Sequence, residues 1–260
     1  MEFLYSRLYA GVAKALKSTL TFAVSRSIEL ETKSYLGGLS FEMHVLQPGV
    51  GVDHEKLNNI PSSLENVDAF FFSRLSPEKG IFDLPEIAFN VAQNKPDLKF
   101  LFAGRFGLAA FKNRFDGLVA AKKLGGKLMY RGFLPESELY GLVKSSRVLL
   151  YPSRHDAFPL VVLETLACGT PVIAYGIPAI TSNFPSDVVM RVPVGDTKQM
   201  AAQASKIIMN PELRHSLSEK AKAFTLRYSW GNVATAEVNA YGRVFAFNTR
   251  GCLRLNQHSR

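Results

Sequence analysis

Apolar runs of strand length alternate with longer segments of helical period along most of the chain. From residue 67 the alternation is regular, and the helical segments place apolar residues three or four positions apart, as at Ile81, Leu84, Ala88 and Val91. Strands that alternate with helices of roughly 10–15 residues predict right-handed crossovers and a parallel sheet covered on both faces. The expected fold class is therefore α/β, a doubly wound, Rossmann-like parallel sheet.

The alternation also gives approximate bounds for each element. The predicted strands are 21–24, 43–46, 69–72, 100–103, 128–130, 148–151 and 171–174, and the predicted helices are 27–36, 81–91, 108–124, 135–144 and 159–167. A loop is expected between residues 46 and 67. Ligands of such sheets bind at the carboxyl ends of the strands, so chemistry is expected in the loops that lead from strands into helices.

The composition is that of an ordinary globular protein, with 47% hydrophobic and 20% charged residues among 260. The longest uncharged stretch, 165–186, is interrupted by prolines, so no membrane-spanning helix is predicted. The two cysteines, Cys168 and Cys252, lie far apart and indicate neither a zinc site nor a disulfide framework. Residues 1–20 are expected to form an amphipathic helix rather than a signal peptide, and a cytoplasmic location is predicted.

The net charge of +9 is distributed unevenly. Residues 95–147 contain 11 basic and 4 acidic residues, and residues 246–260 form a basic tail. Such a face is either a solvated surface or one that attracts phosphates or anionic lipid headgroups, which would allow peripheral membrane contact. Nucleic acid is not expected as a partner, because there is no long Lys/Arg run, RNP-like motif or helix-turn-helix pattern.

Two of the predicted strand-to-helix loops carry charged side chains suited to a ligand. The loop SRLSPEKG (73–80) contains Arg74 and Lys79, which suit a diphosphate, followed by Gly80, which permits close backbone approach. The alternative is that both cations are simply exposed beside a turn. A third loop, GRFG (104–107), has the glycines of many turns that bind no ligand, and the P-loop and dinucleotide-binding fingerprints are both absent.

The loop SRHDAFP (153–159) precedes a predicted helix and contains Asp156, with Glu164 eight residues further on. A carboxylate can accept hydrogen bonds from both hydroxyls of a ribose, and this is a natural role for Glu164. The alternative makes Asp156 the N-cap of the helix and Glu164 an exposed helical residue. The residue pattern by itself leaves both interpretations open.

Several motifs together resemble one known family, the group 1 glycosyltransferases of the GT-B fold, also called family 4. The stretch YPSRHDAFPLVVLETLACGTPVIAY (151–175) is similar to the family's donor-site signature, in which seven residues separate two acidic ones. SRLSPEKG resembles its phosphate-binding loop and YRGFLPESEL (130–139) its turn beside the nucleobase. MRVPVGD (190–196) and YSWGNVATAEVNAYGRV (228–244) resemble the end of its sheet and its closing helix.

The resemblance implies a role for each matching residue. Arg74 and Lys79 would hold the donor diphosphate, Glu164 the nucleotide ribose and Asp156 the transferred sugar, so that Arg74, Lys79 and Asp156 are the expected catalytic residues. The remaining expected donor-binding residues are Gly132, Phe133, Leu134, Phe158, Pro159 and Leu160. The family works without metal and retains the anomeric configuration, which implies no metal site and no cofactor beyond the nucleotide-diphosphate sugar used as substrate.

The chain departs from the family pattern at a few positions. Asp156 stands where the family usually has Glu, Ala157 where a Gly is usual, and Ile177 and Ile180 where many members have Gly and Glu. These changes affect the expected sugar more than the nucleotide.

The resemblance also predicts how the chain is divided. Residues 1–55 are expected to be a remnant of the N-terminal, acceptor-binding domain and its linker, whose earlier strands have no counterpart in this sequence. Residues 65–225 would be the C-terminal nucleotide-sugar-binding domain and 226–245 a crossover helix.

The expected function is that of a retaining, metal-independent hexosyltransferase that acts on a glycan, a lipid or another acceptor, with a partner chain or homodimer supplying the acceptor half. The alternative is a non-catalytic nucleotide-sugar-binding module or a truncated relic.

Overall fold

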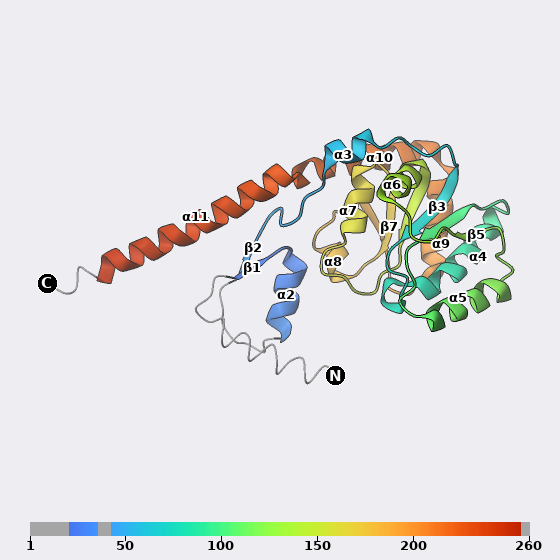
Figure 1. Cartoon of the computed structure of the whole chain (residues 1–260), viewed down its shortest axis with the longest axis horizontal. Coiled ribbons are helices and arrows are strands. Elements are labelled where there is room, and N and C mark those ends of the chain that lie inside the picture. The colour runs from blue at the N-terminus through green and yellow to red at the C-terminus, as the bar shows by residue number, and fades with distance from the viewer. Residues whose placement is uncertain (1–20, 36–42, 256–260) are drawn as a thin grey trace. The chain divides into compact units, whose positions relative to one another are not determined.

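The computed structural model describes residues 21–35 and 43–255, with side chains described at 21–34 and 43–242. Contacts divide the chain into two compact units, of which the larger is Val52–Leu226. The second unit is built from the segments on either side of it. Figure 1 shows the elements of both units along the chain.

The larger unit is built on a six-stranded sheet in the order β5-β4-β3-β6-β7-β8, in which every neighbouring pair is parallel. Numbered along the chain within this sheet, the order is 3-2-1-4-5-6, the arrangement of two mononucleotide-binding halves. The fold class predicted from the sequence is thereby confirmed. The strands are β3 (Val67–Phe72), β4 (Phe100–Ala103), β5 (Leu128–Tyr130), β6 (Ser146–Tyr151), β7 (Val172–Tyr175) and β8 (Val189–Val192).

Helices cover both faces of the sheet, which explains why its central strands are largely apolar, with Asp68 of β3 as a buried exception. Every residue of β3 and of β7 is buried, as expected for strands packed on two sides. α4, α5 and α9 contact one another along one face, whereas α6, α7 and α10 form the other layer (Figure 1). These helices are α4 (Leu84–Asn94), α5 (Ala109–Ala121), α6 (Glu136–Ser145), α7 (Leu160–Ala167), α9 (Thr197–Met209) and α10 (Pro211–Thr225).

The short elements lie in the connections. They are α3 (His54–Asn59), η1 (Pro77–Lys79), η2 (Ile81–Asp83), α8 (Pro178–Thr181) and η3 (Leu226–Tyr228). Of these, α3 lies where the sequence predicted only a loop. The Asp53 carboxylate caps it by accepting a hydrogen bond from the Lys56 amide at 2.9 Å, and Leu57 is buried. One cap and one buried side chain therefore fix a helix too short for its periodicity to be recognised.

The strands are added towards one side of the sheet from β3 to β5 and towards the other side from β6 to β8, so the order reverses between β3 and β6. These two strands are parallel neighbours with Ala69 opposite Val148. The loops that follow these two strands consequently lie side by side at the carboxyl edge, where this class of sheet binds its ligands. A Cβ on Gly80 would lie 2.0 Å from the carbonyl oxygen of Pro152, and Gly80 has a φ of +76°. Glycine is therefore required for this close approach of the two loops.

We expect Gly80→Ala to destabilise the protein by about 2 kcal/mol, because alanine introduces both the clash with Pro152 and a strained left-handed backbone. For a domain of this size that corresponds to a fall in Tm of roughly 4–8 °C, measured by thermal unfolding. Gly125→Ala is the control, since its Cβ would meet no atom within 4 Å. Equal Tm values for the two variants would contradict the close approach.

The second unit contains a small two-stranded parallel sheet of β1 (Thr21–Ala23) and β2 (Met43–Val45), joined through α2 (Arg26–Tyr35). It also contains α11 (Trp230–Leu255), which extends beyond residue 245, the predicted end of the crossover helix. The Phe22 ring meets the Tyr241 ring edge-on at 5.0 Å between centroids. The helix predicted for residues 1–20 and the end of the basic tail lie outside the described residues.

Candidate functional site

The loop after β3 turns sharply at η1, and this turn positions the two predicted diphosphate-binding cations. Gly80 ends η1 in the left-handed conformation, and its amide donates to the carbonyl oxygen of Pro77 at 3.0 Å. The Lys79 side chain is only 14% exposed and reaches across to the loop after β6. Arg74 is exposed, and its guanidinium forms no hydrogen bond or ion pair with the residues that the structure describes. Arg74 is therefore available to an incoming anion.

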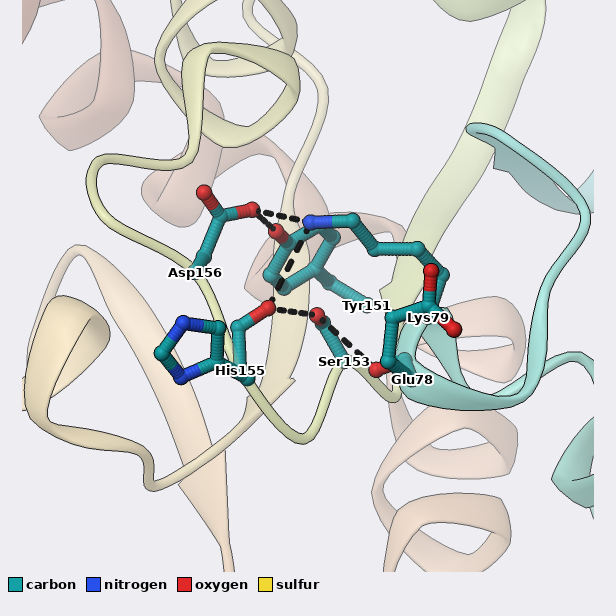
Figure 2. Close-up of polar contacts among 6 residues, drawn as sticks. All are labelled: Glu78, Lys79, Tyr151, Ser153, His155 and Asp156. Atoms are coloured by element: carbon teal, nitrogen blue, oxygen red, sulfur yellow. Dashed lines mark hydrogen bonds and ion pairs between the residues drawn. The ribbon is translucent and has the colours of Figure 1, made fainter. Parts of the chain in front are cut away.

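The loop after β6 is tied to this turn by both backbone and side-chain contacts, and Figure 2 shows those among Glu78, Lys79 and the residues of the loop. The Arg154 amide donates to the carbonyl oxygen of Glu78 at 2.9 Å, and the Ser153 hydroxyl donates to that of His155 at 2.9 Å. The Lys79 ammonium donates to Asp156 Oδ2 at 2.7 Å. Two residues that are far apart in the sequence and both predicted to be catalytic thus form a direct ion pair.

Asp156 is held by two donors on the same carboxylate oxygen. Besides Lys79, the Tyr151 hydroxyl at the end of β6 donates to Oδ2 (Figure 2). Burial alone would raise the pKa of Asp156, but these two hydrogen bonds and the Lys79 charge outweigh it and hold the pKa below its usual value. The alternative that Asp156 caps the following helix is wrong, because the N-cap residue of α7 is Pro159.

The first turn of α7 faces the site without a side-chain cap, since Pro159 at the N-cap offers no acceptor. The amides of Leu160 and Val162 already donate to the carbonyl oxygens of Phe158 and Pro159, each at 3.0 Å, so it is the positive end of the helix dipole that favours a negatively charged group there. Of the residues predicted at this turn, Phe158 is buried, with its ring 5.7 Å from that of Phe184, and Leu160 is 45% exposed.

Glu164 lies further along α7 and is half-buried rather than exposed, which contradicts the alternative of a solvated helical residue. Burial raises the pKa of its carboxyl, although the hydroxyl of Tyr140 on α6 opposes this rise by hydrogen bonding to the carboxylate. A half-buried carboxylate with one neutral partner is an acceptor with unused capacity. It is suited to a pair of hydroxyl groups.

We expect Glu164→Gln to raise stability at pH 7, because amide replaces a carboxylate whose folded-state pKa is raised by burial. The gain should be of the order of 1 kcal/mol, a Tm increase of roughly 2–4 °C. It should shrink as the pH falls to the ordinary glutamate value near 4.5, where the carboxyl is neutral in both states. A gain independent of pH would indicate packing instead, and Glu138→Gln on the exposed side of α6 is the control.

The predicted nucleobase turn follows β5 and is joined to the neighbouring loop. Gly132 has a φ of +71°, and its carbonyl oxygen accepts a hydrogen bond from the Gly104 amide at 2.7 Å. Phe133 is 66% exposed, with the Arg105 guanidinium 4.5 Å above its ring centroid, and Leu134 is half-buried. The turn thus presents an aromatic face and a cation at the same edge of the sheet as Arg74.

A second group of side chains at this edge was not found by sequence reasoning. Arg154 donates to Asp83 at 2.7 Å, and the Tyr175 hydroxyl donates to the same Asp83 oxygen at 2.8 Å. Asp83 and Arg154 also border a pocket of about 450 Å³, whose other lining residues are Pro77, Glu78, Gly80, Phe82 and Arg114. Arg154 stands out in the sequence only as one more loop cation, so its partner could not be identified before the loops were placed.

The family model for group 1 glycosyl transferases matches residues 54–224, well over half of the chain. The chain belongs to this family. Its larger unit thus contains a group 1 glycosyl transferase domain, as the motifs predicted.

Curated relatives of this group 1 glycosyltransferase are named as enzymes that transfer sugars. A D-inositol 3-phosphate glycosyltransferase of Saccharomonospora viridis is 32% identical over 120 residues, 44% of this chain and 27% of the relative. One of Acidothermus cellulolyticus is 25% identical over 77% of this chain and 46% of its own length. The O-antigen chain mannosyltransferase B of Escherichia coli is 26% identical over 45% of this chain and 30% of its own. The chain thus spans between about a quarter and a half of these relatives.

Solved structures share the fold of this group 1 glycosyltransferase. HepE from Anabaena, in complex with UDP, superposes over 93% of this chain and 68% of its own with a TM-score of 0.77 and 18% identity. The C-terminal domain of a group 1 protein from Francisella tularensis is covered entirely, with a TM-score of 0.61 and 19% identity over 69% of this chain.

The described residues contain neither a cluster suited to a metal ion nor a membrane-spanning helix. No three His, Cys, Asp or Glu side chains within 21–34 and 43–242 are grouped as a metal site would require. No helix in the described part of the chain has both the length and the apolar character needed to cross a membrane.

Proposed function

We propose that this chain binds a nucleotide-diphosphate sugar and takes part in transferring its hexose to an acceptor, with retention of anomeric configuration and without a metal ion. The observation that carries this proposal is the pairing of Lys79 with Asp156 at 2.7 Å across the loops after β3 and β6. It brings a cation suited to a phosphate next to a carboxylate suited to sugar hydroxyls. Arg74 and the N-terminus of α7, which has no side-chain cap, lie at the same edge of the sheet.

Each residue takes a part that its surroundings favour. Arg74 and Lys79 bind the diphosphate and stabilise the negative charge that develops when it leaves, so that two cations perform the neutralisation that a metal ion performs in other transferases. Asp156, ionised because of its hydrogen bonds, orients the sugar. The acceptor attacks on the face that the diphosphate leaves, through an oxocarbenium-like state, which gives retention.

The nucleoside is held on the other side of the diphosphate. Glu164 accepts from the ribose hydroxyls, while the turn Gly132, Phe133 and Leu134 contacts the base. The structure of HepE from Anabaena with UDP-glucose supports this use of the shared fold.

The acceptor, in this proposal, is a glycan, a lipid-linked group or a related hydroxyl compound, and the reaction takes place in the cytoplasm. The names of the relatives support a sugar or cyclitol acceptor. We further propose a partner chain or second copy that supplies the acceptor half, in keeping with the exposed Trp230, Val238 and Tyr241 of α11. The excess of basic residues over 95–147 supports peripheral contact with anionic lipid.

Calorimetric titration of the purified chain with UDP, GDP and ADP and with their glucose or mannose conjugates tests the proposal. Micromolar binding of one nucleotide, and of its sugar conjugate, is the expected result. Addition of the bound sugar conjugate and candidate acceptors, with and without proteins encoded nearby, then tests transfer. Failure to bind any of the nucleotides would overturn the proposal, and binding without transfer under all these conditions would favour a non-catalytic binding module.

A further inference from the structure

Tyr151 occupies a position at the site to which neither the sequence motifs nor the proposed roles assign a function. It is the last residue of β6 and is 2% exposed. Its hydroxyl donates to Asp156 Oδ2, the oxygen that also accepts from Lys79 at 2.7 Å. In Figure 2 the phenol and the ammonium meet this one oxygen, while the other carboxylate oxygen of Asp156 points away from both.

The two donors differ in how firmly they are anchored. Tyr151 belongs to a central strand and has only two side-chain torsions, whereas Lys79 extends a four-carbon chain from a turn. Burial, and then the Asp156 charge, raise the pKa of the Tyr151 phenol, so it stays protonated and remains a hydrogen-bond donor over the physiological range. Asp156 itself lies in a loop five residues beyond the strand, where its carboxylate also has a backbone hydrogen bond from Ala157, the next residue of the same loop.

Asp156 and a bound diphosphate would compete for the Lys79 ammonium. A diphosphate carries more negative charge than a single carboxylate, so it draws the ammonium towards itself when it binds. Asp156 then loses its charged partner at the moment when it must be oriented towards the sugar. The phenol of Tyr151 and the Ala157 backbone are contacts that do not depend on Lys79, and of these two only the phenol comes from the rigid sheet rather than from the loop of Asp156 itself.

We propose that Tyr151 is a positioning residue that keeps Asp156 oriented towards the donor sugar once the diphosphate has engaged Lys79. The proposal rests on the proposed function and adds to it a residue that determines sugar recognition. It explains how an aspartate, one methylene shorter than the glutamate usual in the family, is held in one fixed orientation. Tyr151 fixes Oδ2, and the other oxygen remains directed away from both donors.

The test is Tyr151→Phe, which removes only the hydroxyl. For the nucleotide that the wild-type protein binds, calorimetry compares the nucleoside diphosphate with its sugar conjugate. We expect affinity for the diphosphate to change by less than about 2-fold and affinity for the sugar conjugate to fall by about 10-fold. Tyr228→Phe, which removes the hydroxyl of another buried tyrosine, is the matched control and should change neither.

The possible outcomes distinguish the positioning role of Tyr151 from the proposed function of the chain. Equal losses for both ligands would mean that Tyr151 supports the loop as a whole, and no loss for either ligand would mean that Asp156 needs no support from Tyr151. Each of these results overturns the positioning role of Tyr151, while the proposal that the wild-type protein binds the donor still stands. A wild-type protein that binds no nucleotide overturns the proposed function and with it the role in sugar recognition. A second arm needs no ligand: in the free protein, NMR titration should show a higher pKa for Asp156 in Tyr151→Phe, and an unchanged pKa would also overturn the proposal.

Discussion

Glu164→Ala is expected to weaken nucleotide binding by at least about 100-fold. The carboxylate would accept two hydroxyl hydrogen bonds from the ribose, and charge-assisted bonds contribute roughly 1.5–3 kcal/mol each. Removing the carboxylate relieves an ionisation that burial makes unfavourable but also takes the acceptor from the buried Tyr140 hydroxyl, so the Tm of the variant is measured alongside to show that it is folded at the temperature of the titration. Calorimetry of wild type and variant under identical conditions measures the effect.

Two controls make this prediction specific to the ribose. Glu138→Ala removes an exposed carboxylate from α6 and should leave the affinity unchanged. A 2′-deoxynucleotide should bind the wild-type protein at least about 10-fold more weakly than the ribonucleotide, whereas Glu164→Ala should bind the two alike. A variant that still discriminates between them would show that another residue reads the ribose.

Arg74→Ala is expected to weaken binding of the nucleoside diphosphate by roughly 30- to 150-fold, equivalent to about 2–3 kcal/mol. Its guanidinium is exposed and forms no hydrogen bond or ion pair within the described residues. The Ser76 hydrogen bond and, to a smaller extent, the Arg74 charge lower the pKa of Glu78, but that carboxylate is exposed too, so most of the loss comes from the ligand. A planar fork of donors matches phosphate oxygens in pairs, which is why a single arginine has so large an effect. Titration with the diphosphate measures it.

The matching nucleoside monophosphate provides the internal comparison. If Arg74 contacts mainly the distal phosphate, the monophosphate should lose less than about 5-fold in the same variant. Lys112→Ala, which removes one exposed cation from α5, controls for the change in net charge. Similar losses for Arg74→Ala and Lys112→Ala would mean that the diphosphate is attracted by the overall charge rather than by a specific contact.

The elements that could be predicted from the sequence are those whose apolar pattern is long and uninterrupted. The strands expected at 100–103 and 128–130 coincide with β4 and β5, because each is an apolar run that ends where the chain leaves the sheet. β4 is buried along its length, whereas the edge strand β5 is buried only at Leu128. The same pattern placed Lys79 and Asp156 in loops at one edge of the sheet. The family resemblance then assigned their roles, which remain predictions.

The contacts within the site could not be predicted, because they depend on distances that the order of residues does not contain. Tyr151 follows an apolar strand and is indistinguishable in sequence from a core aromatic residue, yet its hydroxyl reaches the carboxylate of Asp156. The partner of Glu164 is Tyr140, on a helix that precedes β6 and becomes its neighbour only when α6 and α7 pack together. Each of these contacts follows from helix and strand packing rather than from local spacing.

The central position of β3 also affects how the protein is made. β3 is among the first strands of its sheet to leave the ribosome, but its neighbour β6 follows only after two further strands and the helices between them. Until then one edge of β3, a strand that is apolar except for Asp68, stays unpaired in the nascent chain, a state that favours aggregation and slow folding. The turn that carries Lys79 acquires Asp156 as its partner in this late step, so a bound nucleotide would mark the newly synthesised chains that have completed their sheet.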